Sequence, residues 1–163
     1  MHMQSVQDAS QTVWGRYLLD EMKAYLQYHI QVLRQCALQA EECEGFEKPA
    51  INIRDTIYQL EHLQESETWD EAVQRRVIDY GRLTFPRKNP NPELAERIKA
   101  ARSACKKGLE RKLRFFSDNS SQILSDLAQS AAGARGLIAL VRQFDRNYAL
   151  AKRSRRCLDF GDL

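Results

Sequence analysis

Positive charges gather in the middle of the chain, and their spacing suggests chemistry more clearly than that of any other residues. Residues 82–114 carry 11 Lys or Arg against 3 Asp or Glu, whereas residues 1–81 carry 7 against 14. Cations spaced along one surface attract a polyanion, because each phosphate contact releases condensed counterions. The predicted phosphate contacts are Arg82, Arg87, Lys88, Arg102, Lys106, Lys107 and Arg111. The alternative is an ordinary solvated face.

Part of this set forms a band at helical spacing. Lys99, Arg102 and Lys106 recur at intervals of three and four, away from the apolar residues of the same stretch. The stretch lacks the cluster of Asn, Gln and Arg with which a recognition helix reads base edges. We therefore expect contacts to the phosphate backbone, which position a protein without reading sequence.

Residues suited to catalysis or metal binding are few and scattered. The chain contains neither a Gly-rich phosphate-binding loop nor the motifs of serine hydrolases and zinc proteases. Its cysteines form no Cys-x-x-Cys pair, and close ligand pairs are typical of zinc sites. They are Cys36, Cys43, Cys105 and Cys157, and we interpret them as reduced core residues. The sequence predicts no catalytic residue, cofactor site or metal site in this chain.

Long helices must position these residues, because only 7 Gly and 4 Pro interrupt the 163 residues. A first helix is predicted over about residues 10–44, since apolar residues recur there every three or four positions. Its expected inward stripe is Trp14, Leu18, Met22, Tyr25, His29, Val32, Cys36, Ala40 and Cys43. A second helix should follow Pro49, and a capping box of Thr68 and Glu71 should open a third helix ending near Gly81.

The basic residues should lie on a fourth helix and on the loop before it. Residues 82–92 hold three of the four prolines, and Asn91 with Pro92 suits a helix start, so the fourth helix should run to about Phe116. A break at 117–121, a short helix, a weak Ala-Gly stretch at 131–136 and a last helix should follow. The predicted fold class is all-α: an elongated bundle of about five or six helices with a long N-terminal helix.

Location and domain boundaries follow from the same patterns. No stretch approaches the roughly 20 apolar residues of a membrane helix, and the first residues show no secretory signal. We therefore expect a cytoplasmic protein that makes no membrane contact. Residues 1–9 are interpreted as the remnant of an expression tag or a disordered start, and residues 10–156 as one helical domain.

The end of the chain carries its most specific pattern. Residues 144–148 (Phe-Asp-Arg-Asn-Tyr), Lys152 and residues 158–163 (Leu-Asp-Phe-Gly-Asp-Leu) resemble the F-D-x-x-Y-x-x-x-K…L-D-F-x-D-L stretch of superfamily 1 DNA helicases of the UvrD/RecB type. Gly161 departs from the Ser or Asp usual at its position. Further segments are similar, in order and spacing, to the AddA branch, the A subunits of bacterial ATP-dependent helicase/nucleases. These segments are residues 14–19 (Trp-Gly-Arg-Tyr-Leu-Leu), 69–71 (Trp-Asp-Glu), 80–83 (Tyr-Gly-Arg-Leu) and 115–117 (Phe-Phe-Ser).

The resemblance implies a place in a larger machine. The chain would be the 1B subdomain, a helical insertion in the first RecA-like motor domain, and residues 157–163 would lead back into that motor. The parent would use ATP and magnesium at sites elsewhere in its chain. It would process DNA ends with an AddB-like subunit in double-strand break repair and recombination. In such helicases the inserted subdomain lies along the duplex ahead of the fork, which agrees with the basic residues found here.

One alternative function remains open. The chain could be a helical protein-interaction module whose acidic first helix docks a partner such as the second subunit. Retention on that subunit, without retention on DNA, would favour this interpretation. A free-standing enzyme is the third possibility, and it would need a cofactor pocket that the sequence does not offer.

Overall fold

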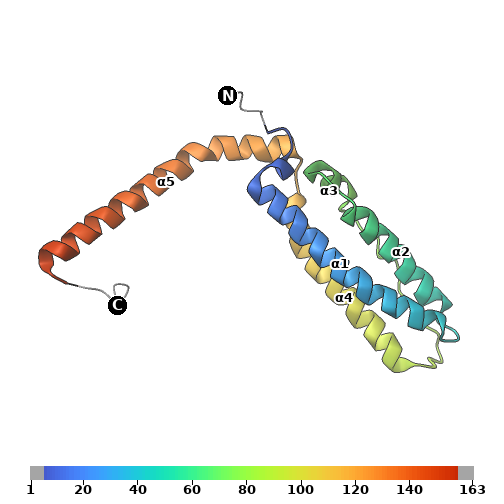
Figure 1. Ribbon diagram of the computed structural model, residues 1–163. Coiled ribbons are helices and arrows are strands. Elements are labelled where there is room, and N and C mark those ends of the chain that lie inside the picture. Colours follow the sequence, from blue (N-terminus) through green and yellow to red (C-terminus); the bar gives the residue numbers. More distant parts are fainter. Residues whose placement is uncertain (1–5, 158–163) are drawn as a thin grey trace. The chain divides into compact units, whose positions relative to one another are not determined.

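The computed structural model describes residues 6–157, and all regular elements within them are helices (Figure 1). The α-helices are α1 (Val13–Glu41), α2 (Glu47–Gln64), α3 (Trp69–Arg75), α4 (Pro92–Leu113) and α5 (Ser120–Arg155). Two short 3-10 helices, Ala9–Gln11 and Arg114–Phe116, precede α1 and follow α4. The predicted all-α fold class is therefore confirmed.

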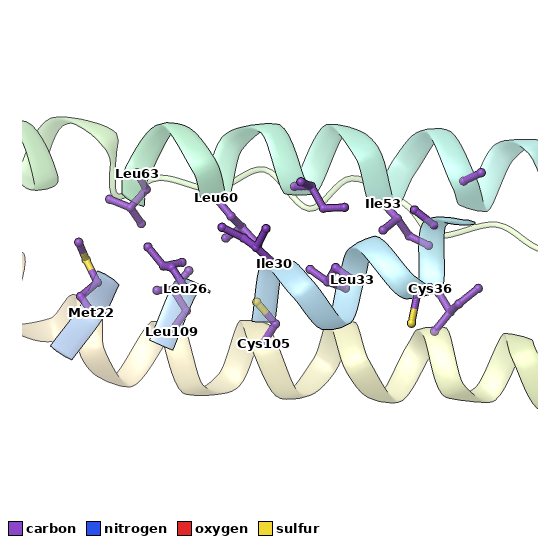
Figure 2. Close-up of a cluster of buried hydrophobic side chains, with 14 of the residues drawn as sticks. Met22, Leu26, Ile30, Leu33, Cys36, Ile53, Leu60, Leu63, Cys105 and Leu109 are labelled. Atoms are coloured by element: carbon purple, nitrogen blue, oxygen red, sulfur yellow. The ribbon is translucent and has the colours of Figure 1, made fainter. Parts of the chain in front are cut away.

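The unit that ends at residue 123 is built around α1, which packs between α2 and α4 (Figure 2). Both neighbours run antiparallel to α1. Arg34 pairs with Glu61 of α2, and Glu41, later in α1, pairs with Arg54, earlier in α2. Glu21 pairs with Lys112 of α4, and Tyr25, later in α1, donates to the carbonyl oxygen of Cys105, earlier in α4. Ten side chains of the shared core are Met22, Leu26, Ile30, Leu33, Cys36, Ile53, Leu60, Leu63, Cys105 and Leu109. Burial of each large apolar side chain contributes about 1.5–3 kcal/mol, so this three-helix seam holds the unit together.

The buried face of α1 is broader than the predicted stripe. Leu19, Leu26, Ile30 and Leu33 are also buried, whereas Trp14 and other predicted members are only partly buried at its edge. A helix with one neighbour needs a single apolar stripe, but α1 has a neighbour on each side. The buried residues of α2 and α4 also recur at helical spacing, and they include Ile53, Ile57 and Leu60 of α2 and Leu94, Ile98 and Cys105 of α4.

The third helix is shorter than predicted. The Thr68 hydroxyl accepts the Glu71 N–H at 3.2 Å, as a capping residue should, but the Glu71 carboxylate accepts the N–H of Glu67 at 2.7 Å instead of completing the box. The helix ends at Arg75, and residues 76–88 are irregular. The predicted end near Gly81 is wrong, because side chains of α2 and α4 take over the backbone hydrogen bonds of this segment, as described below.

The C-terminal part of the chain is one helix instead of two. α5 continues through Ala131–Gly136, where a weak helix or a turn was predicted. Two glycines there cost up to about 1 kcal/mol each relative to alanine, but no proline interrupts the hydrogen-bond ladder, so helix formation propagates through them. From Leu124 onward the chain forms a second unit, separate from the first.

The N-terminal end of the described residues belongs to the packed unit. Ala9 is fully buried, and the Asp8 carboxylate accepts hydrogen bonds from the N–H groups of Ser10 and Trp69 and from the Ser120 hydroxyl, at 2.8, 3.0 and 2.9 Å. Ala9 and Asp8 fall within the stretch interpreted as a tag remnant or disordered start, yet they take part in the packing. The pattern predicted over residues 158–163 lies outside the described residues.

Candidate nucleic-acid interface

Three basic residues of α4 lie on the flank of the helix that faces the irregular segment. The Lys99 ammonium is 5.4 Å from the centre of the Phe85 ring, and the Lys106 ammonium is 5.5 Å from that of Tyr80. The Arg102 guanidinium carbon is 5.7 Å from the centre of the Tyr80 ring. The band predicted from helical spacing is thus present, and it lies against aromatic rings.

The other predicted contacts lie on open surface. Lys107 and Arg111 are exposed and one turn apart on α4, so they share its outer face. Arg82, Arg87 and Lys88 are exposed in the segment before α4. Within residues 6–157, no ion pair or hydrogen bond holds any of these five side chains. They are available to a partner, and their role as phosphate contacts remains a prediction.

Side-chain amides of α2 fix the segment that borders this surface. Gln59 exchanges two hydrogen bonds with the Asp79 backbone: its amide donates to the carbonyl oxygen at 2.9 Å and accepts the N–H at 2.7 Å. The Asn52 amide donates to the Tyr80 carbonyl oxygen at 2.9 Å. Gly81 adopts φ 58°, in the left-handed region that glycine occupies without strain. These contacts replace the helical hydrogen bonds that α3 would have made.

Arg102 fixes the same segment from α4. Its guanidinium donates to the carbonyl oxygens of Tyr80 and Gly81, at 2.6 Å for the second. Burial lowers the pKa of Arg102, although the nearby Tyr80 and Asp79 side chains oppose this effect. Its Nε atom is buried without a hydrogen-bond partner. Arg102 therefore shapes this surface from within, and part of its hydrogen-bonding capacity is already committed to the backbone.

Burial also acts on the groups behind the segment. Burial, together with the neighbouring Cys105, raises the pKa of Tyr80 well above its usual value. Burial raises the pKa of the Cys105 thiol to about 11. The Tyr80 hydroxyl and the Cys105 thiol are therefore uncharged near neutral pH, and they add no negative charge beside the cations of α4.

A cavity of about 450 Å³ lies between α4 and the fixed segment. It is lined by Tyr80, Gly81, Leu83, Lys99, Arg102, Ser103 and Lys106. Three of these side chains are cationic and none is acidic, so the lining favours an anion. We name this group of seven residues the basic cavity.

The basic cavity contains only part of the predicted site. The structure brings Arg102 and Lys106 together there, and the other five predicted contacts lie outside it. Lys99 was left out of the predicted contacts, although its spacing from Arg102 and Lys106 was the signal for it. Tyr80 was not expected at this site, because the sequence predicted that the third helix ends near residue 81. Ser103 is uncharged, and its position in the fourth helix gave no signal for it.

Acidic neighbours moderate the basic surface at its edges. Lys99 pairs with Glu96 at 2.7 Å, but both side chains are more than half exposed, so the pair is worth little. Glu110 lies near Lys106 around a second, smaller cavity of about 240 Å³. Lys112 pairs with Glu21 of α1 at 3.4 Å and was not among the predicted contacts.

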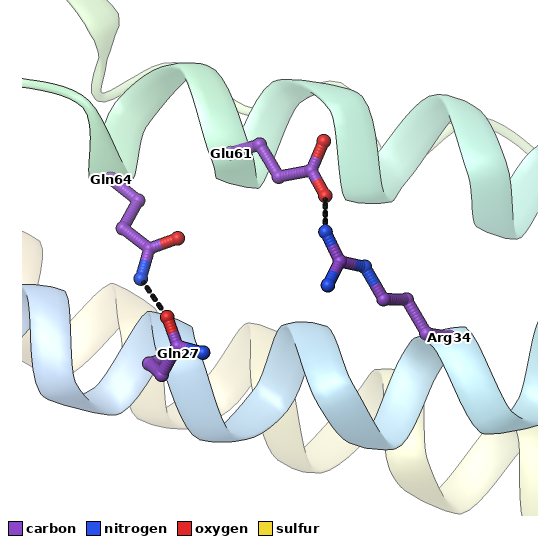
Figure 3. A network of polar contacts seen from close by, with 4 residues as sticks. All are labelled: Gln27, Arg34, Glu61 and Gln64. Carbon is purple, nitrogen blue, oxygen red and sulfur yellow. Dashed lines mark hydrogen bonds and ion pairs between the residues drawn. The ribbon is translucent and has the colours of Figure 1, made fainter.

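Charged side chains along the boundary between α1 and α2 are paired (Figure 3). Arg34 pairs with Glu61 and Arg54 with Glu41, each at 2.6 Å. The amides of Gln64 and Gln27 join the same two helices at 2.7 Å. α1 itself carries three basic and three acidic residues. Glu42 and Glu44 of the helix predicted over residues 10–44 follow the end of α1, so α1 itself carries no net charge. Most acidic residues of the first half of the chain lie between residues 41 and 71.

Candidate ligands for metals do not come together in the part of the chain that the structure describes. No group of three His, Cys, Asp or Glu side chains is placed to hold a metal ion there. His29 is buried between Tyr25 and Tyr28, with ring centres 4.3 and 5.0 Å away, and burial lowers its pKa. Cys36 and Cys105 are buried core residues, as predicted, whereas Cys157 is exposed.

Comparison with known proteins gives one consistent result. The A subunit of the ATP-dependent helicase/nuclease from Clostridium beijerinckii is 25% identical to this chain over an alignment of 171 residues, which covers 99% of the chain. The proteins of the same name from Thermoanaerobacter sp. and Clostridium novyi are 24% and 25% identical over 92% and 91% of it. The chain is similar to a part of these helicase/nuclease proteins. This finding confirms the resemblance inferred from the sequence motifs.

The similarity covers a small fraction of each relative. The chain spans about 14% of the length of the C. beijerinckii protein and about 12% of the other two. No protein-family model and no solved structure matches the chain. Among the described residues, none of the helices is both long enough and apolar enough to cross a membrane.

Proposed function

We propose that this chain is a non-catalytic, DNA-contacting helical part of an ATP-dependent helicase/nuclease, equivalent to the 1B insertion of the motor domain. One observation carries this proposal: α4 and the segment before it present exposed cations on the side away from the core, in a chain similar to helicase/nuclease A subunits. Phosphate contacts of this kind hold duplex DNA in register without reading its sequence.

The proposed contacts would have different roles, because they differ in exposure and in hydrogen bonding. Arg82, Arg87, Lys88, Lys107 and Arg111 are exposed and would bind phosphates directly. Arg102 holds the backbone at residues 80 and 81, so its main contribution would be to keep the surface in shape. Lys106, beside the Tyr80 ring, would contact the DNA from the flank of α4.

The wider role of the parent protein is part of the same proposal. The parent would use ATP and magnesium, at sites outside this chain, to drive movement along DNA. With an AddB-like subunit it would process DNA ends in double-strand break repair and recombination in the bacterial cytoplasm. In that parent, residues 157–163 would lead from this helical part back into the motor domain.

A binding titration tests the proposal. The 163-residue chain is titrated against a fluorescent duplex with a single-stranded tail over a series of salt concentrations. Each phosphate contact on B-DNA makes the slope of log K against log salt more negative by about 0.9. Five or six contacts should therefore give a slope near −5. A duplex that is not retained even at low salt would rule the proposal out.

Charge reversal locates the contacts. The double substitution Lys106→Glu and Lys107→Glu should weaken duplex binding and flatten its salt dependence, because it replaces two positive charges by two negative charges that repel phosphate. Arg34→Glu with Arg54→Glu, on the ion-paired face of α1 and α2, changes the charge equally and serves as the control. Equal losses in the two variants, both checked for folding by circular dichroism, would mean that DNA responds only to net charge.

A second candidate function, docking of a protein partner, rests on α5. Large apolar side chains are exposed along this helix, with Leu137, Leu140 and Phe144 at 63, 64 and 67% of their full exposure. Contiguous exposed apolar residues often mark an interface. The partner would be the second subunit or the remainder of the parent chain. Co-purification of the chain with that subunit, without DNA retention at low salt, would favour this candidate over the first.

A further inference from the structure

We propose that the basic cavity is a specific site for one phosphate group, held by Lys99, Lys106 and the Ser103 hydroxyl. The inference deepens the proposed function and rests on it for the source of the phosphate, which would be the backbone of duplex DNA. It goes further because it separates one shaped site from the general positive charge of α4.

The walls of the basic cavity are fixed before any ligand arrives. One wall is the backbone of residues 79–81, which Gln59 and Asn52 hold from α2 and Arg102 holds from α4. The other wall is α4, which the core anchors through buried Cys105 and Leu109. A site that needs no rearrangement loses little conformational entropy on binding. The outer face of α4 differs in this respect, because the side chains of Lys107 and Arg111 are exposed and make no ion pair or hydrogen bond within residues 6–157.

The cationic groups converge on the cavity from successive turns of one helix. Lys99 and Lys106 are seven residues apart, which is about 10.5 Å along the helix axis, and Ser103 lies between them. Each ammonium rests near an aromatic ring, at 5.4 Å for Lys99 and 5.5 Å for Lys106. An aromatic ring beside an ammonium group attracts it without neutralising its charge. Lys99, Ser103 and Lys106 line the same cavity, so we place the phosphate group between the two lysines.

The chemistry of the lining selects a phosphate group. Two ammonium groups and a hydroxyl supply donors from several directions, and charge-assisted hydrogen bonds to phosphate oxygens are stronger than neutral ones. The lining contains no carboxylate, so a cation would find no charged ligand in it. Glu96, which pairs with Lys99 at 2.7 Å, and Asp79 and Glu110 nearby would weaken the site without occupying it.

The first experiment uses inorganic phosphate and the 163-residue chain without DNA. Backbone amide signals of residues 80–83 and 99–106 are followed by NMR as phosphate replaces chloride at constant ionic strength. The expected result is saturable shifts confined to these residues. The variant Lys99→Gln with Lys106→Gln should abolish saturation, whereas Lys107→Gln with Arg111→Gln, which removes two charges from the outer face of the same helix, should leave it unchanged. Non-saturating shifts, or equal effects in the two variants, would overturn the proposal.

The second experiment asks whether the phosphate comes from DNA. Because the two lysines hold one phosphate, Lys99→Gln with Lys106→Gln should reduce the salt slope of duplex binding by about 0.9, and not by the roughly 1.8 expected of two separate contacts. Ser103→Ala should weaken binding at every salt concentration without changing the slope. A slope change near 1.8 would show two independent contacts and contradict the single site.

Failure of this inference can be told apart from failure of the proposed function. Duplex binding that tolerates Lys99→Gln with Lys106→Gln but is lost with Lys107→Gln and Arg111→Gln would keep the proposed function and refute the phosphate site. Saturable phosphate binding in a chain that does not bind the duplex would have the opposite meaning: the cavity would take a free phosphate group, and the DNA role would be refuted.

Discussion

α1 and the part of α5 after residue 123 are both long helices, but different forces stabilise them. α1 has 29 residues and buries ten of them. Residues 124–157 contain no buried residue at all. Packing against α2 and α4 thus holds α1, whereas local hydrogen bonds and helix propensity must hold this part of α5. An apolar face at helical spacing predicts a helix in both cases and does not tell whether that face is covered.

This difference makes α5 the part of the chain whose state depends most on its surroundings. Leu137, Val141 and Phe144 expose more than half of their surface, although each would contribute about 1.5–3 kcal/mol if buried. The packed unit has already gained such energy from its own core. The predictions that follow test this contrast by changing one region at a time.

The largest effect is expected at Trp69, at the end of the packed unit. Its ring is buried against Phe116 and meets Trp14 edge-on, with centres 4.3 and 5.5 Å away, and its Nε1–H donates to the Asp118 carbonyl oxygen at 2.9 Å. Trp69→Ala should lower the free energy of unfolding by about 3–5 kcal/mol, measured by urea denaturation. Phe144→Ala in α5 is the control. A loss at Trp69 no greater than at Phe144 would contradict the contrast.

A smaller loss is expected at Asp8, which joins three chain segments. Its carboxylate accepts hydrogen bonds from the N–H groups of Ser10 and Trp69 and from the Ser120 hydroxyl. Asp8→Ala leaves these donors without a partner and should cost about 1–3 kcal/mol. The same urea titration measures it. Asp20→Ala, on the exposed side of α1, should change stability by less than about 0.5 kcal/mol.

The pH dependence of stability gives a second test at Asp8. Burial by itself would raise the pKa of this carboxyl, but the hydrogen bonds from Ser10, Trp69 and Ser120 together outweigh it and hold the pKa below the usual 3.8. A carboxyl group whose pKa is lower in the folded chain than in the unfolded chain stabilises the fold at pH values above its pKa in the unfolded chain. This stabilisation is lost as the pH falls through its pKa in the folded chain. The wild-type chain should therefore lose stability more steeply than Asp8→Ala below about pH 4. If the stability of the two chains depends on pH in the same way, the ionised Asp8 carboxylate does not stabilise the fold.

One substitution should act in opposite directions in α4 and α5. A Cβ atom on Gly108 would lie 2.6 Å from Cζ of Tyr25 and displace its hydroxyl from the carbonyl oxygens of Ala104 and Cys105. Gly108→Ala should therefore destabilise the packed unit by about 1–3 kcal/mol. Gly136 has nothing within 4 Å of the same position, so Gly136→Ala should stabilise α5 by up to about 1 kcal/mol. Amide hydrogen exchange in each helix measures both. Destabilisation by both substitutions would mean that α5 is packed in solution.

The sequence predicted helices well where local signals agree. Asn91 and Pro92 mark the start of α4, and the Leu94 N–H indeed donates to the Asn91 side chain at 3.0 Å. It failed where distant side chains decide. The end of α3 is set by Asn52, Gln59 and Arg102, which bind the backbone of residues 79–81 from two other helices. No local pattern reports such contacts.

The candidate site was predicted in composition but not in arrangement. Charge counting found the basic stretch, and helical spacing found the flank of Lys99, Arg102 and Lys106. Neither could show that Arg102 is committed to backbone carbonyl oxygens. Nor could they show that Tyr80 and Ser103 complete a cavity. Those facts depend on where residues 76–88 lie, and long-range packing fixes that position.

The smallest effect is expected from the apolar face of α5. Leu137→Ser with Phe144→Ser removes two large exposed side chains, and because neither is buried, the free energy of unfolding of the packed unit should change by less than about 0.5 kcal/mol. The same variant should lose affinity for any protein that covers α5, because the transfer of its apolar surface out of water drives such docking. Co-purification with the second subunit measures this, with Ser125→Ala as a control elsewhere on the helix. A large loss of stability in the isolated chain would show that α5 covers its own apolar face, and the contrast between the two helices would then fail.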